Sequence, residues 1–241
     1  MNTAILHFHG ELEELAGGGC RPYAVTRRAS VKDVVEALGV PHTEVYSLEA
    51  DGQPVGFSML LEPGQAVHVR PGAPPVDVTA PGALREPLGA PRFLADVNVG
   101  RLATYLRLLG IDTAYDNARK DADLARLAHD EGRVVLTMDR GVLRRKAVQW
   151  GRLVRLADPV EQARDVVRFF GLSSLVNPMS LCVRCNVPLE RAHKADVLHL
   201  LLPLTRAHYH AFTRCPSCGR VYWAGSHHAK MAAMAQRIIA P

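Results

Sequence analysis

The residues best suited to catalysis are five aspartates in the middle of the chain. Four of them end a short apolar segment, as in the stretch RVVLTMD, and the fifth opens the segment DADLARLAHDEG. Crowded carboxylates repel one another and call for a cation, and ligands that offer only oxygen favour Mg²⁺ or Mn²⁺. Such an ion orients a water molecule and neutralises charge that develops on a phosphodiester. The candidate catalytic residues are Asp96, Asp116, Asp121, Asp139 and Asp158.

Capping is the alternative role for these aspartates, because Asp at a strand end or helix start is common turn chemistry. For any one residue taken alone, capping is the better interpretation. Asp158 is especially open to it, since a proline follows, and Asp121 can cap a helix and bind a metal at once. For Asp96 and Asp139 together we favour the metal, because the residues that follow them do not obviously start a capped helix.

Alternating strands and helices are expected to position these acids. The predicted strands are RFLAD, IDTAYD, RVVLTMD and RLVRLAD, and the predicted helices are GRLATYLRLLG, DADLARLAHDEG, GVLRRKAVQWG and PVEQARDVVRFFG. This order predicts βαβ units and a parallel sheet flanked by helices, which is an α/β fold. Ligand sites in open parallel sheets lie at the carboxyl ends of the strands, where the four strand-end acids would meet.

Two C-x2-C pairs near the end of the chain form the strongest motif. Cys182 and Cys185 form CVRC, and Cys215 and Cys218 form CPSC. Two such turns complete a tetrahedral zinc site, and four thiolates leave no open position, so this zinc should be structural. A redox dithiol is the alternative, but two pairs of cysteines argue against it. Cys20 stands alone and is expected to be a free thiol.

The net charge of +5 conceals two oppositely charged halves. Residues 1–90 hold 6 Lys and Arg against 11 Asp and Glu, a net of −5, whereas residues 91–241 hold 23 against 13, a net of +10. A basic half suggests a polyanionic partner, most simply a nucleic acid. A basic surface without a partner is the alternative.

Two stretches place cationic and aromatic side chains where RNA could be held. The run RRK follows RVVLTMD closely, and VYWAGSHHAK follows the second cysteine pair. The first could equally be a solvated helix face, and the aromatic pair of the second could simply pack the ribbon. The two histidines could also act as an acid or phosphate donor. The candidate RNA-binding residues are Arg144, Arg145, Lys146, Tyr222, Trp223, His227, His228 and Lys230.

The domain organisation follows from a stretch rich in proline and glycine, PGAPPVDVTAPGALREPLGAP, which breaks every periodic pattern. We expect a small α+β roll over residues 1–72, a linker over 73–90, the α/β domain over 91–175, and a zinc ribbon with a tail over 176–241. No segment has the length of a membrane-spanning helix, and the N-terminus lacks the pattern of a secretion signal. We therefore expect a cytoplasmic protein.

Residues 91–238 resemble the mut-seven C-terminal (Mut-seven-C) RNase domain, through RFLADVNVGRLATYLRLLGIDTAYD, DADLARLAHDEGRVVLTMDR, the cysteine pairs and RVYWAGSHH. The resemblance implies a PIN-like nuclease with a fused zinc ribbon and metal-dependent RNA cleavage. By motif, the implied metal-binding acids are Asp96, Asp121 and Asp139. Asp112 also matches a family position, though it lies at the other strand end. Many PIN nucleases have a further acid after the T-x-D acid, where this chain has basic residues, and Asn98 stands where the family more often has an apolar residue.

Residues 1–72 resemble the ubiquitin-like domain that often precedes this RNase domain, through SVKDVVEALGVPHTEV and VHVRPG. Small sulfur carriers share this likeness but need a free C-terminal Gly-Gly, whereas RPGAPP runs on into the linker. We therefore expect an interaction or regulatory module that binds a protein partner.

The residues and the resemblance together predict a ribonuclease, a hydrolase that depends on Mg²⁺ or Mn²⁺ and carries structural Zn. Its expected partner is RNA, such as tRNA or another structured RNA. The alternative is an RNA- or ribosome-binding module whose nuclease site is weak or lost. The missing acid after the T-x-D position motivates this alternative.

Overall fold

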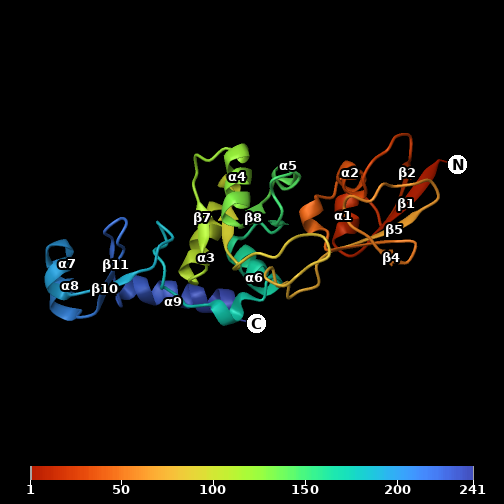
Figure 1. Ribbon diagram of the computed structural model, residues 1–241. Coiled ribbons are helices and arrows are strands. Elements are labelled where there is room, and N and C mark those ends of the chain that lie inside the picture. The colour runs from red at the N-terminus through yellow and green to blue at the C-terminus, as the bar shows by residue number, and fades with distance from the viewer. Residues whose placement is uncertain (1, 241) are drawn as a thin grey trace.

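The computed structural model describes residues 2–240, except for the side chain of His227. An N-terminal α+β unit and a C-terminal ribbon lie at opposite ends of the molecule, with a parallel sheet and its helices between them (Figure 1). Within residues 2–240, no helix combines the length and the hydrophobicity needed to cross a bilayer.

The N-terminal unit is the expected α+β roll. Its sheet has the order β2-β1-β5-β3-β4, in which β1 and β5 are parallel and the other pairs are antiparallel. The Ser30 side chain accepts a hydrogen bond from the backbone of Asp33, and this capping box starts α2. The elements are β1 (Thr3–Phe8), α1 (Leu12–Ala16), β2 (Cys20–Ala24), α2 (Val31–Ala37), η1 (His42–Glu44), β3 (Ser47–Ala50), β4 (Gln53–Pro54) and β5 (Ala66–Arg70).

The stretch between the first two units contains no helix or strand, yet it packs against both. Val76 and Val78 are buried, and the guanidinium group of Arg85 donates a hydrogen bond of 2.9 Å to the carbonyl of Thr43. That guanidinium group also lies over the ring of Trp150, at 4.9 Å from the ring centroid. Residues 73–90 therefore form a connection that packs against both units, rather than a linker without tertiary contacts.

The central unit is a four-stranded sheet with the order β7-β6-β8-β9, and all three neighbouring pairs are parallel. The strand and helix order confirms the predicted βαβ pattern. The elements are β6 (Phe93–Ala95), η2 (Val97–Val99), α3 (Gly100–Leu108), β7 (Thr113–Tyr115), α4 (Asp121–Glu131), β8 (Val134–Thr137), α5 (Arg140–Leu143), β9 (Gly151–Leu153), α6 (Pro159–Phe169) and η3 (Leu172–Leu175).

Alternate residues of the central strands bury different faces of this sheet. Phe93 and Leu136 belong to a hydrophobic cluster with residues of α3 and α6, whereas Leu94 and Val135 belong to a second cluster with residues of α4 and α5. Both faces are covered, which is why these strands read as continuous apolar runs rather than as an alternation.

The second cluster continues into the core of the N-terminal unit, so the two units share one hydrophobic core. Ion pairs border this contact: the carboxylate of Glu44, whose side chain is 1% exposed, lies 3.3 Å from the guanidinium group of Arg152. His42 Nε2 contacts the carbonyl oxygen of Val148 at 2.9 Å. The N-terminal unit is thus fixed against α5 and β9, close to the carboxyl edge of the sheet.

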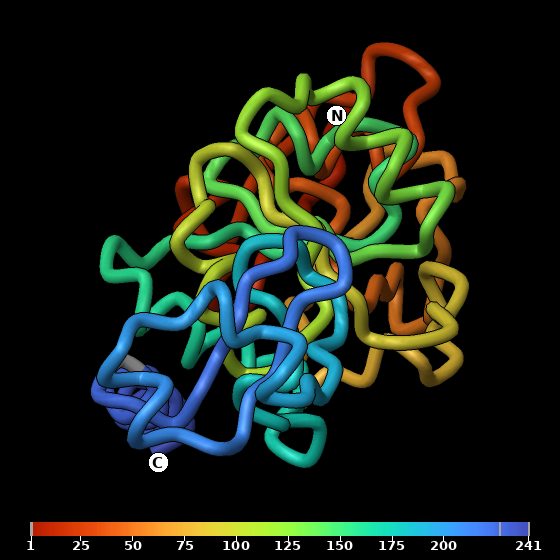
Figure 2. Tube along the Cα trace, turned by 90° about the vertical axis from the view of Figure 1, so that its left-hand side faces the viewer, coloured from red at the N-terminus to blue at the C-terminus, as the bar shows by residue number. Residues whose placement is uncertain are grey.

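The ribbon is an antiparallel sheet of the order β10-β11-β12, followed by a long helix that returns to the central unit. Helix α9 packs against α6 and α3, and Figure 2, viewed from the ribbon end, shows the ribbon in front of the rest of the chain. The elements are β10 (Glu190–Ala192), α7 (Lys194–Val197), η4 (Leu198–Leu200), α8 (Pro203–His208), β11 (Phe212–Arg214), β12 (Val221–Trp223) and α9 (Ser226–Ile239).

Candidate functional site

The carboxyl edge of the parallel sheet carries three of the predicted acids. Asp96 directly follows β6, Asp116 directly follows β7, and Asp139 lies two residues beyond β8. Because β6 is hydrogen-bonded to both β7 and β8, these acids belong to neighbouring strands. The expectation that Asp158 ends a strand is wrong, because β9 ends at Leu153 and the chain runs on before α6 begins.

Asp96 is the most constrained of these acids, with 3% of the residue exposed. Its Oδ2 accepts hydrogen bonds from the Thr137 hydroxyl at 2.6 Å and from the Asn98 amide at 2.9 Å. Its Oδ1 accepts from the backbone N–H of Val97 at 2.7 Å. A carboxylate has about four lone-pair positions, so these three donors leave one free while they fix the orientation of the group.

Thr137 joins Asp96 to Asp139. While its hydroxyl donates to Asp96, the same oxygen accepts a hydrogen bond of 2.9 Å from the backbone N–H of Asp139. The side-chain Oδ1 of Asn98 accepts a hydrogen bond of 3.2 Å from the backbone N–H of Met138, which adds a second link between the ends of β6 and β8. Asp139 itself is exposed, and its Oδ1 accepts from the backbone N–H of Gly141 at 2.6 Å.

Asp96 and Asp139 also cap short helices, which corrects the expectation that neither residue starts a capped helix. Asp96 is the N-cap of η2 and Asp139 is the N-cap of α5. Each helix is only one turn long, too short to show apolar periodicity in the sequence. Capping uses Oδ1 of each acid, and within residues 2–240 no hydrogen bond is formed by Oδ2 of Asp139.

The remaining acids form contacts of their own, with other residues than Asp96 and Asp139. Asp121 is the first residue of α4 but not its N-cap, which is Lys120, and it pairs instead with Arg145 at 3.4 Å. The exposed Asp116 accepts a backbone hydrogen bond of 3.0 Å from Ala118. In the part of the chain that the structure describes, no three carboxylates come within metal-ligand distance of one another.

Asp158 is the N-cap of α6, where its Oδ1 accepts from the backbone N–H groups of Val160 and Glu161 at 2.9 and 3.1 Å. Replacing Asp158 by alanine is expected to lower the free energy of unfolding by about 1 kcal/mol, because two N–H groups of the first turn lose their acceptor. Urea unfolding would measure the loss. Asp123→Ala, on the exposed face of α4, is the control and should cost less than half as much.

Asp112 lies at the opposite edge of the sheet and has a structural role. Its carboxylate accepts hydrogen bonds from Arg133 at 2.8 Å and from the Asn186 amide at 2.6 Å, and its carbonyl accepts from Phe93. Asn186 belongs to the first cysteine loop. Asp112 therefore ties the ribbon to the amino edge of the sheet, away from the other acids.

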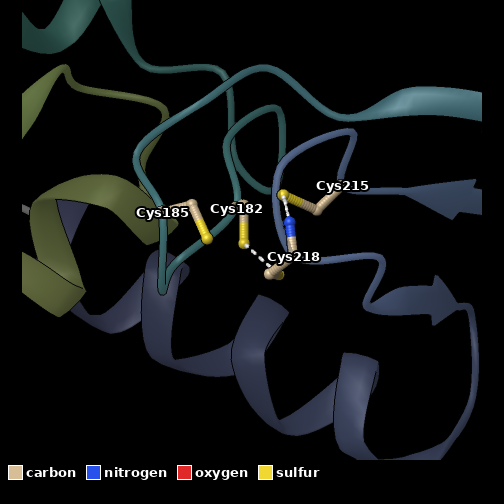
Figure 3. A group of neighbouring side chains, drawn as sticks. All are labelled: Cys182, Cys185, Cys215 and Cys218. Carbon is tan, nitrogen blue, oxygen red and sulfur yellow. Dashed lines mark hydrogen bonds between the residues drawn. The ribbon is translucent and has the colours of Figure 1, made fainter.

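The four cysteines of the two C-x2-C pairs converge from two loops above α9 (Figure 3). Their sulfur atoms all lie within 4.8 Å of one another, and those of Cys182 and Cys218 are 3.9 Å apart. Tetrahedral zinc with Zn–S bonds of about 2.3 Å separates its sulfur ligands by about 3.8 Å. The four sulfurs fit this geometry and could hold a zinc ion.

The two cysteine loops have the same backbone design. In each, the N–H of the first cysteine donates to the carbonyl five residues later, and its carbonyl accepts from the residue four positions later. That fourth residue has a left-handed backbone, with φ of 61° for Asn186 and 71° for Gly219. Because both loops form this turn, the two sulfur atoms of each loop lie close to the two of the other loop.

The titration of the thiols also favours a bound cation. Burial opposes ionisation of Cys182, but hydrogen bonds from the Tyr222 hydroxyl and from backbone N–H groups outweigh it and lower the pKa of this thiol to about 6. Burial and the neighbouring thiols raise the pKa of Cys185 to about 12. The four thiols therefore ionise together only when a positive charge lies among them.

The predicted RNA-binding residues fall into two separate groups. The basic run lies just beyond α5, not on a longer helix as expected, because α5 ends at Leu143. The Tyr222 hydroxyl lies 3.2 Å from Cys182 Sγ, and the ring of Trp223 contacts Phe212, so both aromatic residues pack the ribbon. His228 and Lys230 lie on α9. The side chain of His227 is outside what the structure describes.

Thr137 is the site residue that the sequence analysis did not single out. It is fully buried and is the only side chain hydrogen-bonded both to Asp96 and to the backbone of Asp139 among the described residues. Its signal in the sequence is the spacing of T-x-D at a strand end, which places a hydroxyl beside the backbone N–H two residues later.

Comparisons with known proteins match the chain in two intervals. A family model described as Mut7-C RNAse domain matches residues 91–235, more than half of the chain, and one described as Mut7-C ubiquitin matches residues 1–77. No curated protein matches the chain. Among solved structures, it is similar to a chain described as molybdopterin converting factor, subunit 1, from Pyrococcus furiosus. Sequence identity is 20%, the TM-score is 0.26, and the match covers 30% of this chain and 100% of that chain.

Proposed function

The chain belongs to the Mut7-C RNAse domain family, and on that premise we propose that it is a ribonuclease that cleaves RNA phosphodiester bonds with a divalent cation. The observation that carries the proposal is the linked pair of acids at the carboxyl ends of two neighbouring parallel strands, Asp96 and Asp139, which meet through Thr137. Ligand sites of open parallel sheets are found at this edge.

The donors at this edge are carboxylate oxygens, the ligand type that Mg²⁺ and Mn²⁺ prefer. Asp139 would contribute its Oδ2, and Asp96 would contribute its remaining lone pair. Asp121 is the proposed third ligand and would exchange its pairing with Arg145 for the cation; Asp116 and Asp158 are less well placed. The cation supplies a polarised water and neutralises negative charge on the phosphate.

Neighbouring residues support this chemistry in ways that do not involve the cation. The Thr137 hydroxyl and the Asn98 amide hold the Asp96 carboxylate in one orientation. The basic run beyond α5, which includes Arg144 and Lys146, lies close in the chain to Asp139, and we propose that it contacts RNA phosphates. The four cysteines are proposed to hold zinc in a structural role.

Cleavage of labelled structured and single-stranded RNA tests the function. With Mn²⁺ or Mg²⁺ the protein should cut RNA, and with EDTA it should not. The Asp96→Asn/Asp139→Asn double variant should lose at least about 100-fold in rate, because the cation contributes several kcal/mol. Asp123→Asn is the matched control, since it removes the same charge from an exposed acid that pairs with Arg126. Equal rates in the double variant and the control would refute the proposal.

A second candidate function is an RNA-binding module with a weak or lost nuclease site. Asn98 favours it, because its amide occupies an acceptor position of Asp96 that a cation would otherwise use. Asp121 also has a cationic partner in Arg145. Tight RNA binding in EDTA, with no cleavage in Mn²⁺, would support this function over the first.

A further inference from the structure

Three histidines lie together on the outer face of the N-terminal sheet, and the proposed function uses none of them. The inward residues of β1 and β5, such as Leu6 and Val67, are fully buried, so the alternate residues of both strands point outward. His7 and His68 are register partners on these parallel strands, and His9 directly follows β1. All three histidines are partly buried.

The imidazole rings of these histidines are in contact. His9 Nε2 lies 2.9 Å from His68 Nδ1. The ring of His7 stacks on that of His68, with the ring centroids 4.9 Å apart and the planes inclined by 20°. A contact of 2.9 Å between two ring nitrogens needs a hydrogen on one and a lone pair on the other, so at least the acceptor ring is neutral. Neutral imidazole is the form that binds metal ions.

We propose that His9 and His68 bind a transition-metal ion, Ni²⁺ or Cu²⁺, through one ring nitrogen each. Metal–nitrogen bonds of about 2.0–2.1 Å at a right angle place two neighbouring ligand nitrogens about 2.9 Å apart. The distance between His9 Nε2 and His68 Nδ1 has this value. Nitrogen ligands in tetragonal geometry are typical of these two ions. Within residues 2–240 no third histidine, cysteine or acid joins the two at metal-ligand distance, so water would fill the other positions.

The same contact is a hydrogen bond when no ion is bound, and the ion would replace the hydrogen between the two nitrogens. The ring that donated this hydrogen would then carry it on its other nitrogen, so two neutral rings bind the ion without a net loss of protons. Arg70 lies on the same face, two positions after His68, and it pairs with Glu49 at 3.1 Å. This pairing offsets a positive charge that would otherwise repel the ion.

Calorimetric titration with Ni²⁺ tests the site in the full-length chain, after one equivalent of Zn²⁺ has been added for the cysteines. An excess of Mg²⁺ in the buffer would occupy sites that offer only oxygen. Wild type should bind one Ni²⁺ ion, and His9→Gln and His68→Gln should each weaken that site at least about tenfold, because disturbing an outer contact of a ligand already costs that much. His129→Gln, which removes an exposed histidine of α4, is the matched control and should leave the affinity unchanged.

His7 is a positioning residue in this site, because its ring packs flat against that of His68 and limits its rotation. His7→Phe keeps an aromatic ring at this position and should bind Ni²⁺ as wild type does. His7→Ala removes the ring and should weaken the site about tenfold. Equal affinities in His7→Phe and His7→Ala would overturn the positioning role.

Nuclear magnetic resonance locates the ion independently of its affinity. Octahedral Ni²⁺ is paramagnetic, so the imidazole signals of His9 and His68 should broaden before that of His129. Equal Ni²⁺ affinity in His68→Gln and His129→Gln, or broadening that begins at other histidines, would overturn the inference. Circular dichroism of the folded variants ensures that a lost site is not a lost fold. The site uses none of the strand-end acids, so its failure would leave the proposed cleavage untouched.

Discussion

If the four cysteines hold zinc as proposed, replacing Cys215 by serine is expected to abolish zinc binding and unfold the ribbon. Cys215 is fully buried, and among the described residues the ribbon's own core has only Val197, Leu201 and Phe212 as buried apolar residues. We expect that a core of that size does not offset the chain entropy of the sheet β10–β12 and that a bound metal ion supplies the difference. Structural zinc contributes about 10–16 kcal/mol of apparent binding free energy in small zinc modules.

Metal analysis and circular dichroism would measure this effect. Wild-type protein should contain one zinc ion per chain, and Cys215→Ser should contain almost none and show a lower content of ordered structure. Cys20→Ser is the matched control, because Cys20 is exposed and lies in the N-terminal unit. Stoichiometric zinc in Cys215→Ser, or an intact ribbon after the metal is removed, would contradict the structural role.

Replacing Arg152 by leucine is expected to destabilise the contact between the N-terminal unit and the parallel sheet by about 3 kcal/mol. The guanidinium group of Arg152 bonds to Glu11 and Glu44 and lies over the ring of Phe169, at 3.9 Å from its centroid. The substitution leaves Glu44 buried with Arg155 and the backbone N–H of Leu153 as its remaining partners among the residues that the structure describes. A buried carboxylate that loses one of its cationic partners is costly, because water does not replace the lost interaction.

The loss of stability caused by Arg152→Leu should depend on pH. Burial raises the pKa of Glu44 above its ordinary value of 4.5, and Arg152 and Arg155 offset part of this shift. Without Arg152 the pKa should rise further, so the folded variant should bind a proton that the unfolded chain has lost. The stability that comes from this proton on Glu44 is present at pH 4.5 and below, and it disappears as pH rises through the pKa of Glu44 in the folded variant. The destabilisation should therefore be largest near pH 7 and smaller near pH 4.5.

Urea unfolding of Arg152→Leu and wild type at these two pH values measures both effects. Arg126→Leu is the control, because Arg126 forms an exposed pair with Asp123 that should contribute less than about 1 kcal/mol. A cost for Arg152→Leu equal to that of the control would show that the buried ion pairs do not hold the units together.

The architecture could be predicted because its signals are local. Apolar runs of three to five residues between periodic segments predicted the parallel sheet, and the paired cysteines predicted that the four thiols would converge. The carboxyl-edge position of Asp96 and Asp139 followed from the parallel order alone. Each of these features depends on residues that are close together in the chain.

The errors have a common physical cause, which is that short elements and distant contacts leave little pattern in a sequence. The one-turn helix α5 has no periodicity, so its cap at Asp139 and its early end were missed. Asn98 and Thr137 are 39 positions apart, and Glu44 and Arg152 are 108 apart, yet both pairs are in contact. Only the folded chain brings such residues together.

The most direct measurement is a calorimetric titration of the zinc-loaded protein with Mn²⁺, in wild type and in Asp139→Asn. If the strand-end acids hold a catalytic cation, wild type should bind Mn²⁺ at a single site, and Asp139→Asn should weaken that site at least about tenfold, while Asp123→Asn leaves it unchanged. Absence of Mn²⁺ binding by wild type, or equal affinity in Asp139→Asn, would contradict a metal-dependent nuclease site at this edge of the sheet.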